Sequence, residues 1–480
     1  MKVMLINPPD FKMIQGAIPK ELGADRMGKY PPLGLLYLAG FAKSKDPSLD
    51  IKIVDAITDS LSLDDIEREI AQFSPDVVGV SVYTFTLIDA IDVSGIVKRV
   101  RSQAVVVWGG FHPSIYPEES LRSSPDVDIV VAGEAEETFY LILQKLKDGS
   151  SPFGIDGVSV RGKDGVINVS KAVPFTRDLD MLSFPDRTMV SYKKHSCILG
   201  AGGLTTNILT SRGCPFGCKY CYVNIRSYRL RSIDNVIKEI KECIALGIND
   251  FFFVDDLFNI SKERVAEFSD RVIAEGISIH WSFRGRVDQI DRAMLEKAKK
   301  AGCVRIHYGV ESGVPEILKR IGKGTKTEMV RKAIMLSREC GIEVSSNIMI
   351  GLPGESPDKT EETIRFLLSL KTNYVQAAVF TPYPETPLYK EGIEKGLLPG
   401  DYWREFALRP KSSFEPYIWP EFYTRETVFD KLRALYRRFY LRPSFVIKYI
   451  SSIKSFAAFK MIFKNAFTLL SLIAKRRSKA

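Results

Sequence analysis

The sequence contains few histidines, few cysteines and no long apolar run. Only four of its 480 residues are histidine and seven are cysteine. Seven unevenly spaced cysteines in a chain of this length do not make a disulfide framework. No segment resembles a signal peptide, and none reaches the roughly 18–20 uncharged apolar residues that a transmembrane helix needs. These absences predict a cytoplasmic protein of two or three domains, in which clustered cysteines bind a metal.

Acidic residues are absent from the last 50 residues. Of the 68 Lys and Arg residues, 13 lie in 431–480, which leaves 55 against 58 Asp and Glu in residues 1–430. The net charge of +10 therefore belongs to a tail, and a nucleic-acid-binding surface over the whole molecule is not predicted. Aromatic residues alternate with the cations of this tail. It can lie on the inner face of a membrane as a basic amphipathic helix, or it can pack on the preceding domain, and both interpretations stay open.

Residues 1–145 alternate short apolar runs with helical stretches. The runs are continuously apolar, which is typical of parallel strands covered on both faces. We therefore predict an α/β domain with a doubly wound, flavodoxin-like parallel sheet, whose ligand lies at the carboxyl ends of the strands. The predicted strands are 2–7, 51–55, 77–82, 105–108 and 129–132.

The rest of the chain divides into three parts. Residues 146–190 contain scattered Gly and Pro and are predicted to form an irregular connector. Strand–helix alternation resumes in 191–400, which favours a partial or full β/α TIM-type barrel with its chemistry at the carboxyl ends of the strands. Residues 401–480 are predicted to form a basic, C-terminal helical module. The predicted barrel strands are 206–210, 250–254, 279–283, 305–309, 343–350 and 374–380.

Three of the cysteines lie close together directly after the first predicted barrel strand. Cys214, Cys218 and Cys221 can hold three corners of an iron–sulfur cube, since thiolates are the usual ligands of such clusters. The fourth iron would then be free for a substrate or cofactor. The alternative is a zinc site completed by Cys197 or His195. Structural zinc sites favour paired cysteines, so this spacing favours the cluster.

The cysteine spacing, with an aromatic residue before the last cysteine, resembles the signature of the radical S-adenosylmethionine (SAM) superfamily over about residues 190–400. The resemblance implies a [4Fe–4S] cluster whose open iron binds SAM, with Tyr220 near the adenine. Asp255 and Asp256 would hold the SAM amino group, although they can also cap a helix. The other implied SAM contacts are Glu311, Ser312, Gly351 and Pro382. Gly351 can also belong to a plain turn.

The N-terminal domain resembles the cobalamin-binding domain that precedes some radical SAM barrels. Dinucleotide binding is disfavoured, because no G-x-G-x-x-G follows the first strand. Ile57 stands where many cobalamin domains have a cobalt-ligating histidine, so the resemblance implies cobalamin without a protein imidazole on cobalt. We expect His112 to lie behind the residues that contact the ligand or on the surface, and not to ligate cobalt. The residues that the resemblance places at cobalamin are Ser81, Tyr83, Thr84, Gly109, Gly110, Gly133 and Glu134.

These two resemblances together imply a B12-dependent radical SAM enzyme, related to the anaerobic magnesium-protoporphyrin cyclase and hopanoid methylase group. The expected reaction is methylation of an unactivated carbon of a small molecule or lipid, through a 5′-deoxyadenosyl radical. Radical rearrangement or oxidative cyclisation is the alternative, and a non-catalytic cobalamin or redox sensor is a distant one. We expect a monomer that receives electrons from an external donor such as flavodoxin or ferredoxin.

Overall fold

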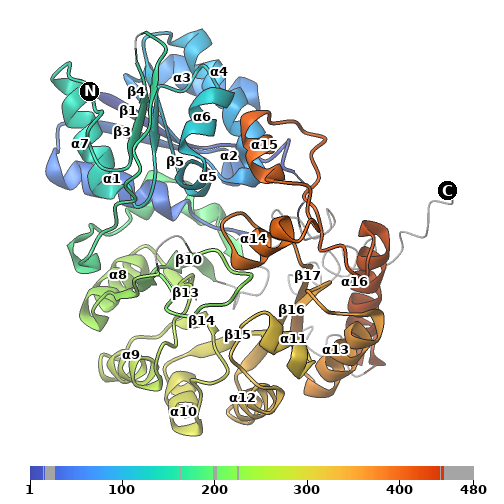
Figure 1. Ribbon diagram of the computed structural model, residues 1–480. Coiled ribbons are helices and arrows are strands. Elements are labelled where there is room, and N and C mark those ends of the chain that lie inside the picture. Colours follow the sequence, from blue (N-terminus) through green and yellow to red (C-terminus); the bar gives the residue numbers. More distant parts are fainter. Residues whose placement is uncertain are drawn as a thin grey trace.

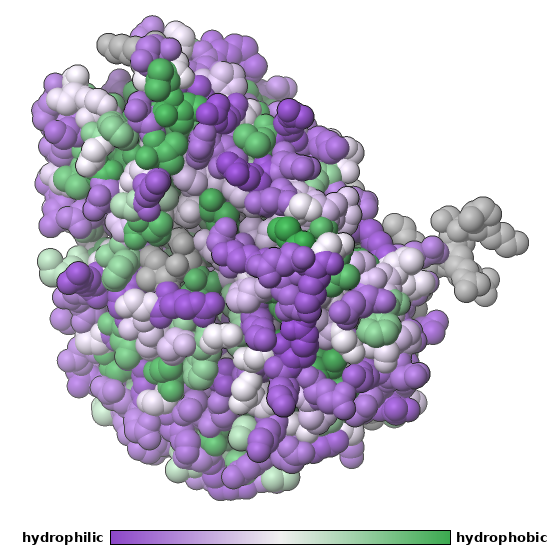
Figure 2. Space-filling view, viewed as in Figure 1, coloured by the Kyte–Doolittle hydropathy of each residue, from purple (hydrophilic) through white to green (hydrophobic). Residues whose placement is uncertain are grey.

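The computed structural model describes residues 1–14, 16, 28–162, 164–197, 203–223, 226–443 and 445–447. Two sheets with their covering helices lie one above the other in Figure 1, and the N-terminal sheet is the upper one. Hydrophilic side chains dominate the face shown in Figure 2, with apolar side chains scattered among them. Among the described residues, no helix has both the length and the apolar character to cross a membrane.

The N-terminal sheet has the strand order β3-β1-β4-β5-β6-β7-β8, and its first five strands are parallel. Alternate residues of β1 supply both faces: Met4 and Ile6 pack into one core cluster, whereas Val3 and Leu5 pack into another. This confirms the doubly wound sheet. The parallel strands are β1 (Lys2–Asn7), β3 (Asp50–Asp55), β4 (Val77–Ser81), β5 (Val105–Gly109) and β6 (Ile129–Val131).

Helices cover both faces of this sheet (Figure 1). The strand order reverses between β1 and β4, so the carboxyl-end crevice of a doubly wound sheet opens there. The helices are α1 (Leu33–Lys45), α2 (Ala56–Asp59), α3 (Leu63–Phe73), α4 (Leu87–Val100), α5 (Phe111–Ile115), α6 (Pro117–Ser123) and α7 (Glu136–Lys147).

Two short strands of the segment 146–190, which was predicted to be an irregular connector, extend the N-terminal sheet. Strand β7 (Val158–Arg161) pairs antiparallel with β6, and β8 (Ile167–Asn168) pairs antiparallel with β7. These strands have only four and two residues, which is too short for a clear apolar run. Strand β7 pairs with β6 and β8 pairs with β7, so both belong to the sheet, and the prediction of an irregular segment was wrong for these two strands.

The second sheet has six parallel strands in the order β10-β13-β14-β15-β16-β17. Its end strands do not pair with each other, so it is the partial form of the predicted barrel. The strands are β10 (Leu204–Ile208), β13 (Ile248–Phe253), β14 (His280–Gly285), β15 (Cys303–Glu311), β16 (Glu343–Ile350) and β17 (Tyr374–Val379).

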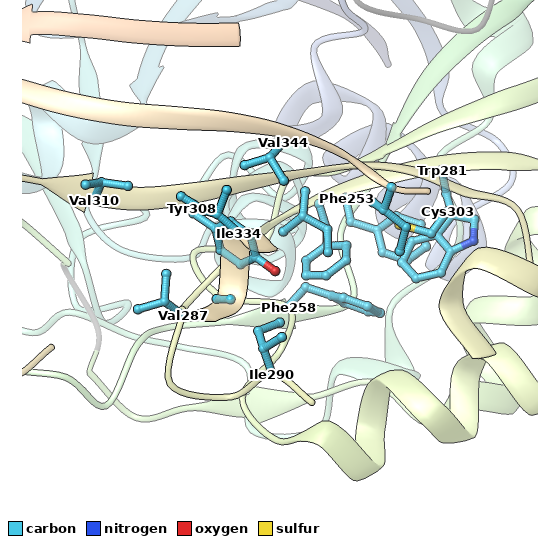
Figure 3. Close-up of a cluster of buried hydrophobic side chains, with 14 of the residues drawn as sticks. Phe253, Phe258, Trp281, Val287, Ile290, Cys303, Tyr308, Val310, Ile334 and Val344 are labelled. Atoms are coloured by element: carbon cyan, nitrogen blue, oxygen red, sulfur yellow. The ribbon is translucent and has the colours of Figure 1, made fainter. Parts of the chain in front are cut away.

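Aromatic side chains fill the space between this sheet and its helices. The ring centroid of Phe253 lies 4.7 Å from that of Phe258 and 5.5 Å from that of Trp281. Figure 3 shows these three side chains in one buried cluster. Edge-to-face and offset contacts at these distances stabilise a core beyond simple burial. The covering helices are α8 (Ile233–Ala245), α9 (Lys262–Ala274), α10 (Arg292–Lys300), α11 (Pro315–Arg320), α12 (Thr327–Glu339) and α13 (Pro357–Leu370).

The chain after β17 connects both sheets through helices. After α14 (Pro387–Glu394), helix α15 (Tyr402–Leu408) buries Trp403 and Phe406 in a core cluster of the N-terminal sheet. Helix α16 (Arg425–Tyr440) instead packs on the barrel (Figure 1). This helix confirms the predicted helical character of the C-terminal region. Residues 448–480, which hold most of the basic tail, lie outside the described residues.

Helix α16 closes one edge of the second sheet. The Tyr436 hydroxyl accepts a hydrogen bond from Ala377 N–H and donates one to Ala377 C=O, both 2.9 Å long. The Tyr440 hydroxyl makes the same pair of bonds with Val375, at 3.2 and 2.9 Å. An edge strand otherwise presents these backbone groups unpaired, so the two tyrosines protect β17.

Candidate functional site between the two sheets

A cavity of about 750 Å³ lies between the carboxyl ends of the N-terminal strands and the mouth of the barrel. The loops after β4, β5 and β6 form its upper wall, and residues at the ends of β10, β13 and β14 form its lower wall. The structure therefore brings predicted residues of both halves of the chain to one space. The predicted residues that line it are Ser81, Tyr83, Gly109, Gly110, Gly133, Glu134 and Asp256.

Glycines in the upper wall serve two purposes: some leave space for a ligand, and others allow a backbone conformation that a side chain would prevent. A Cβ built on Gly34 or Gly109 would meet nothing within 4 Å, and both residues line the cavity, so their missing side chains leave room for a ligand. Gly110 has φ +116° and a Cβ there would lie 2.8 Å from the Val82 carbonyl oxygen. Gly133 has φ +83°, and a Cβ there would lie 2.5 Å from the Pro174 carbonyl oxygen. At Gly110 and Gly133 the positive φ and the close backbone contact require glycine.

Large aromatic side chains also line the cavity. Tyr83 and Phe111 are 48% and 50% exposed, and their stacked rings lie 5.8 Å apart. The ring of Phe111 also lies edge-on to that of Tyr222, with 6.4 Å between the ring centroids. Tyr222 is the residue directly after Cys221. Exposed aromatic rings in a concave wall are typical of a ligand site. Sequence reasoning singled out Tyr83 alone among these three residues.

His112 is neither a surface residue nor part of the cavity wall. Its side chain is fully buried, and its Nδ1 lies 3.0 Å from the Thr84 hydroxyl. Burial lowers the pKa of His112 to about 3, so the imidazole is neutral at pH 7. Thr84 therefore positions a buried histidine. Ile57 lies on α2 and is not among the lining residues, which include no histidine in the described part of the chain.

The three clustered cysteines lie on one loop between two short strands. Strands β11 (Ser211–Arg212) and β12 (Arg229–Leu230) pair antiparallel and hold the ends of this loop together. Cys218 is buried, and Cys214 and Cys221 are partly buried. Burial, together with the neighbouring Cys218, Asp256 and Cys214, raises the pKa of Cys221 to about 12.

The residues weighed for a zinc site lie elsewhere. The Cys197 thiol accepts a 2.8 Å hydrogen bond from the Tyr30 hydroxyl, and Cys197 pairs with Gly28 between β9 (Ser196–Cys197) and β2 (Gly28–Lys29). His195 is buried, and the charges that influence it are those of Asp55, Asp59 and Arg187. These positions favour the three-thiol arrangement over a zinc tetrahedron.

Two arginines attach the cysteine loop to the N-terminal sheet. Arg212 contacts Glu136 at 2.5 Å and Glu134 at 3.0 Å, and Arg229 contacts Glu134 at 2.7 Å. All four side chains are at least mostly buried, and both arginines come from the strands that hold the loop. Glu134 was predicted to bind cobalamin, and the structure engages it with these arginines. Such long-range pairs are invisible in the sequence.

The two aspartates after β13 differ in what can reach them. Asp255 is fully buried and accepts hydrogen bonds from the Thr210 amide, the Thr210 hydroxyl and the Ser211 hydroxyl, at 2.7, 2.5 and 2.6 Å. Asp256 lines the cavity, and its pKa is raised by burial, an effect that Arg284 and the Gly213 amide partly offset. A ligand in the cavity therefore meets Asp256, whereas Asp255 holds β10 and β13 together.

A buried triad lies beside the cysteine loop. Lys323 contacts Glu311 at 2.9 Å, and the Tyr220 hydroxyl lies 3.1 Å from the same carboxylate oxygen and 3.2 Å from the lysine nitrogen. Glu311 ends β15 with φ +62°, a strained conformation for a residue with a side chain. Lys323 was not predicted, because it lies in a loop without a motif.

The remaining predicted residues are engaged within the protein. The Ser312 hydroxyl lies 3.0 Å from that of Thr363. Gly351 has φ +79°, and its amide donates a 2.7 Å hydrogen bond to Glu355. The carbonyl of Pro382 accepts hydrogen bonds from the Tyr402 hydroxyl and the Trp403 indole, so it attaches α15 to the end of the barrel.

Comparison with known proteins supports this arrangement. The chain matches the Radical SAM superfamily over residues 208–367 and the B12 binding domain over residues 19–143. It is 32% identical to an uncharacterised methyltransferase of Pyrococcus horikoshii, covering 93% of this chain and 94% of the relative. It is also 27% identical to the anaerobic magnesium-protoporphyrin IX monomethyl ester cyclase of Rubrivivax gelatinosus, over 88% of this chain and 76% of the cyclase.

A solved structure shares the two-sheet arrangement. The radical SAM methyltransferase TsrM of Kitasatospora setae, with cobalamin and a [4Fe–4S] cluster bound, superposes with a TM-score of 0.71. The match is 18% identical and covers 92% of this chain and 89% of that chain. The fold and the site define a class of protein in which a doubly wound domain is placed over an open β/α barrel. The chain belongs to the radical SAM superfamily, among its members that carry a B12-binding domain.

Proposed function

We propose that the protein is a cobalamin-dependent radical SAM methyltransferase that acts on an unactivated carbon. One observation carries the proposal: the glycine-lined wall of the N-terminal sheet and Asp256, which follows the second barrel strand, line the same cavity. When bound, the cluster supplies the electron that splits SAM, and cobalamin carries the methyl group. The cyclase relative makes radical cyclisation on the same cofactors the second candidate.

The cysteine loop supplies ligands suited to an iron–sulfur cluster. Cys214, Cys218 and Cys221 are three thiols on one partly buried loop, which is the donor chemistry that such clusters need. Asp256 is the carboxylate that a SAM amino group can reach. The Tyr220 hydroxyl is held in place by hydrogen bonds with Lys323 and Glu311. These residues bind and orient, and the surrounding barrel excludes water.

The upper wall supplies the fit for cobalamin. The open space at Gly34 and Gly109 forms a cradle that a Cβ would fill, and Ser81 and Tyr83 border it. Because the described lining residues include no histidine, we propose cobalamin without a protein imidazole on cobalt. We also propose a monomer with an external flavodoxin or ferredoxin as electron donor. The substrate would be a small molecule or a lipid, and the cationic tail would allow peripheral contact with the cytoplasmic membrane face.

The proposal is tested by anaerobic reconstitution with iron, sulfide, cobalamin and SAM labelled in its methyl group. We expect both 5′-deoxyadenosine and S-adenosylhomocysteine, because SAM serves once as radical source and once as methyl donor. Mass spectrometry of extracted lipids and small molecules then locates the labelled methyl group. Deoxyadenosine without S-adenosylhomocysteine would favour cyclisation, and neither product would contradict the proposal.

A further inference from the structure

Two polar side chains inside the barrel, those of Arg284 and His307, lie against the same aromatic ring. The guanidinium of Arg284 on β14 lies 5.3 Å from the centroid of the Phe252 ring. The imidazole of His307 on β15 lies 5.4 Å from the same ring centroid. Arg284 and His307 are paired in the register of these neighbouring strands. Neither side chain forms a hydrogen bond or ion pair within the described part of the chain.

Among the described residues, no carboxylate lies within ion-pair distance of Arg284. Arg284 lines the cavity, and the nearest acidic influence on it comes from Asp256, which is not within ion-pair distance. Burial lowers the pKa of Arg284, an effect that Asp256 and Tyr30 offset only in part. The Arg284 side chain is exposed within the cavity, so its guanidinium can exchange water for a bound carboxylate or phosphate without breaking a contact inside the protein. Arg284 can therefore supply the cation of an ion pair whose anion belongs to a bound ligand.

His307 complements this cation as a neutral hydrogen-bonding group. Burial, together with the nearby charges of Arg305 and Arg284, lowers the pKa of His307 to about 3. A neutral imidazole offers one N–H donor and one acceptor. Arg305 itself pairs with Glu343, so it does not compete for the same ligand. A planar guanidinium and an imidazole beside an aromatic wall suit a carboxylate or phosphate oxygen attached to an apolar body.

We infer that Arg284 and His307 bind a carboxylate or phosphate group of the substrate, which makes the substrate an anion. The inference rests on the proposed function, because the barrel receives a substrate only if it carries out SAM chemistry. Asp256 stays available for an amino group, and Lys323 is already paired with Glu311. Among the described residues of the cavity wall, Arg212 and Arg229 are paired with glutamates, and Arg284 is the cation whose charge is open to a bound anion.

The test is carbethoxylation of His307 in the reconstituted enzyme with saturating SAM, followed by peptide mass spectrometry. Butyrate, butyl phosphate and butylamine serve as probes of equal chain length. The exposed His280 on the same strand as Arg284 is the internal control. We expect butyrate or butyl phosphate to slow modification of His307 and not of His280, and butylamine to leave both unchanged. Arg284→Gln should abolish this protection, and Arg284→Lys should retain part of it.

Several outcomes would overturn the inference. Equal protection by butylamine, or protection that persists in Arg284→Gln, would show that charge recognition by Arg284 is not involved. Protection by SAM alone that depends on Arg284 would assign the site to the carboxylate of SAM. Cluster content and 5′-deoxyadenosine release are measured on the same preparation. If both are intact while protection fails, only the inference falls, whereas their loss would count against the proposed function.

Discussion

Glu239 joins two arginines in a fully buried triad. Its carboxylate contacts Arg187 at 2.5 Å and also contacts Arg231, and the three side chains are at most 3% exposed. Burial alone would raise the pKa of Glu239, but the two arginines outweigh burial and lower it. Arg187 also donates to the Asn207 carbonyl and Arg231 to the Leu209 carbonyl, so the triad attaches α8 to the first barrel strand.

The first prediction concerns this triad. Glu239→Gln should lower the free energy of unfolding by about 3–5 kcal/mol, because it leaves two buried guanidiniums without a counter-charge. Denaturant unfolding followed by circular dichroism measures the change. The control is Glu275→Gln, which removes a partly exposed carboxylate at the surface that pairs with Lys241 and Arg271, and it should leave the midpoint nearly unchanged. Equal losses in both variants would argue against the triad.

Gly109 allows a test of the cobalamin cradle at one residue. Its backbone φ is not in the left-handed region and its Cβ direction is open, so Gly109→Leu should fold normally and fill the cavity. We expect the purified variant to retain less cobalamin than the wild-type protein at an unchanged thermal midpoint, measured by absorbance and calorimetry. Gly110→Leu is the contrast, because strain with Val82 should lower its midpoint. Full cobalamin retention in Gly109→Leu would place cobalamin elsewhere.

At the scale of an element, the turn after β16 depends on a buried carboxylate. Glu355 accepts hydrogen bonds from the amides of Gly351 and Leu352 at 2.7 and 3.2 Å, and it is fully buried. Burial raises the pKa of Glu355 to about 7 from an ordinary 4.5, although these amides partly offset the effect. The folded state therefore keeps a proton on this carboxyl group where the unfolded chain has lost it.

This turn should make stability depend on pH. Between pH 4.5 and about 7 the native state binds more protons at Glu355, so its contribution falls as pH rises and is flat above that window. The difference is on the order of 3 kcal/mol. Glu355→Gln keeps an acceptor for both amides and should remove this slope. Unfolding free energies of both proteins at pH 5, 6, 7 and 8 test it, and parallel curves would contradict the assignment.

At the scale of the whole molecule, the N-terminal sheet was predictable because its parallel strands, buried on two faces, read as continuous apolar runs, and the second sheet because strands and helices alternate regularly along the chain. The cysteine loop was predictable because its three ligands are close in sequence. The short β7 was missed because four residues carry too little pattern. The pairs of Arg212 and Arg229 with Glu134 were missed because they join residues about 80 to 95 positions apart, and only the folded chain brings them together.

The same distinction explains the uneven outcome at the predicted site residues. Motifs correctly marked the ends of strands, but a strand end carries both residues that face the cavity and residues that hold the strands. Asp256 and Asp255 are neighbours in the sequence with these two different roles. Which of them faces a ligand depends on the direction of each side chain in the folded sheet.

The central claim is that one cavity joins the two cofactor sites. Electron paramagnetic resonance of the reconstituted enzyme tests it, with cobalamin as Co(II) and the cluster reduced. The account predicts that the reduced cluster broadens the cobalt signal or speeds its relaxation, because two unpaired spins in one cavity interact. Cys218→Ala should abolish this effect together with the cluster and leave the cobalt signal of an isolated cobalamin. A cobalt signal unaffected by a fully reduced cluster in the wild-type protein would contradict the account.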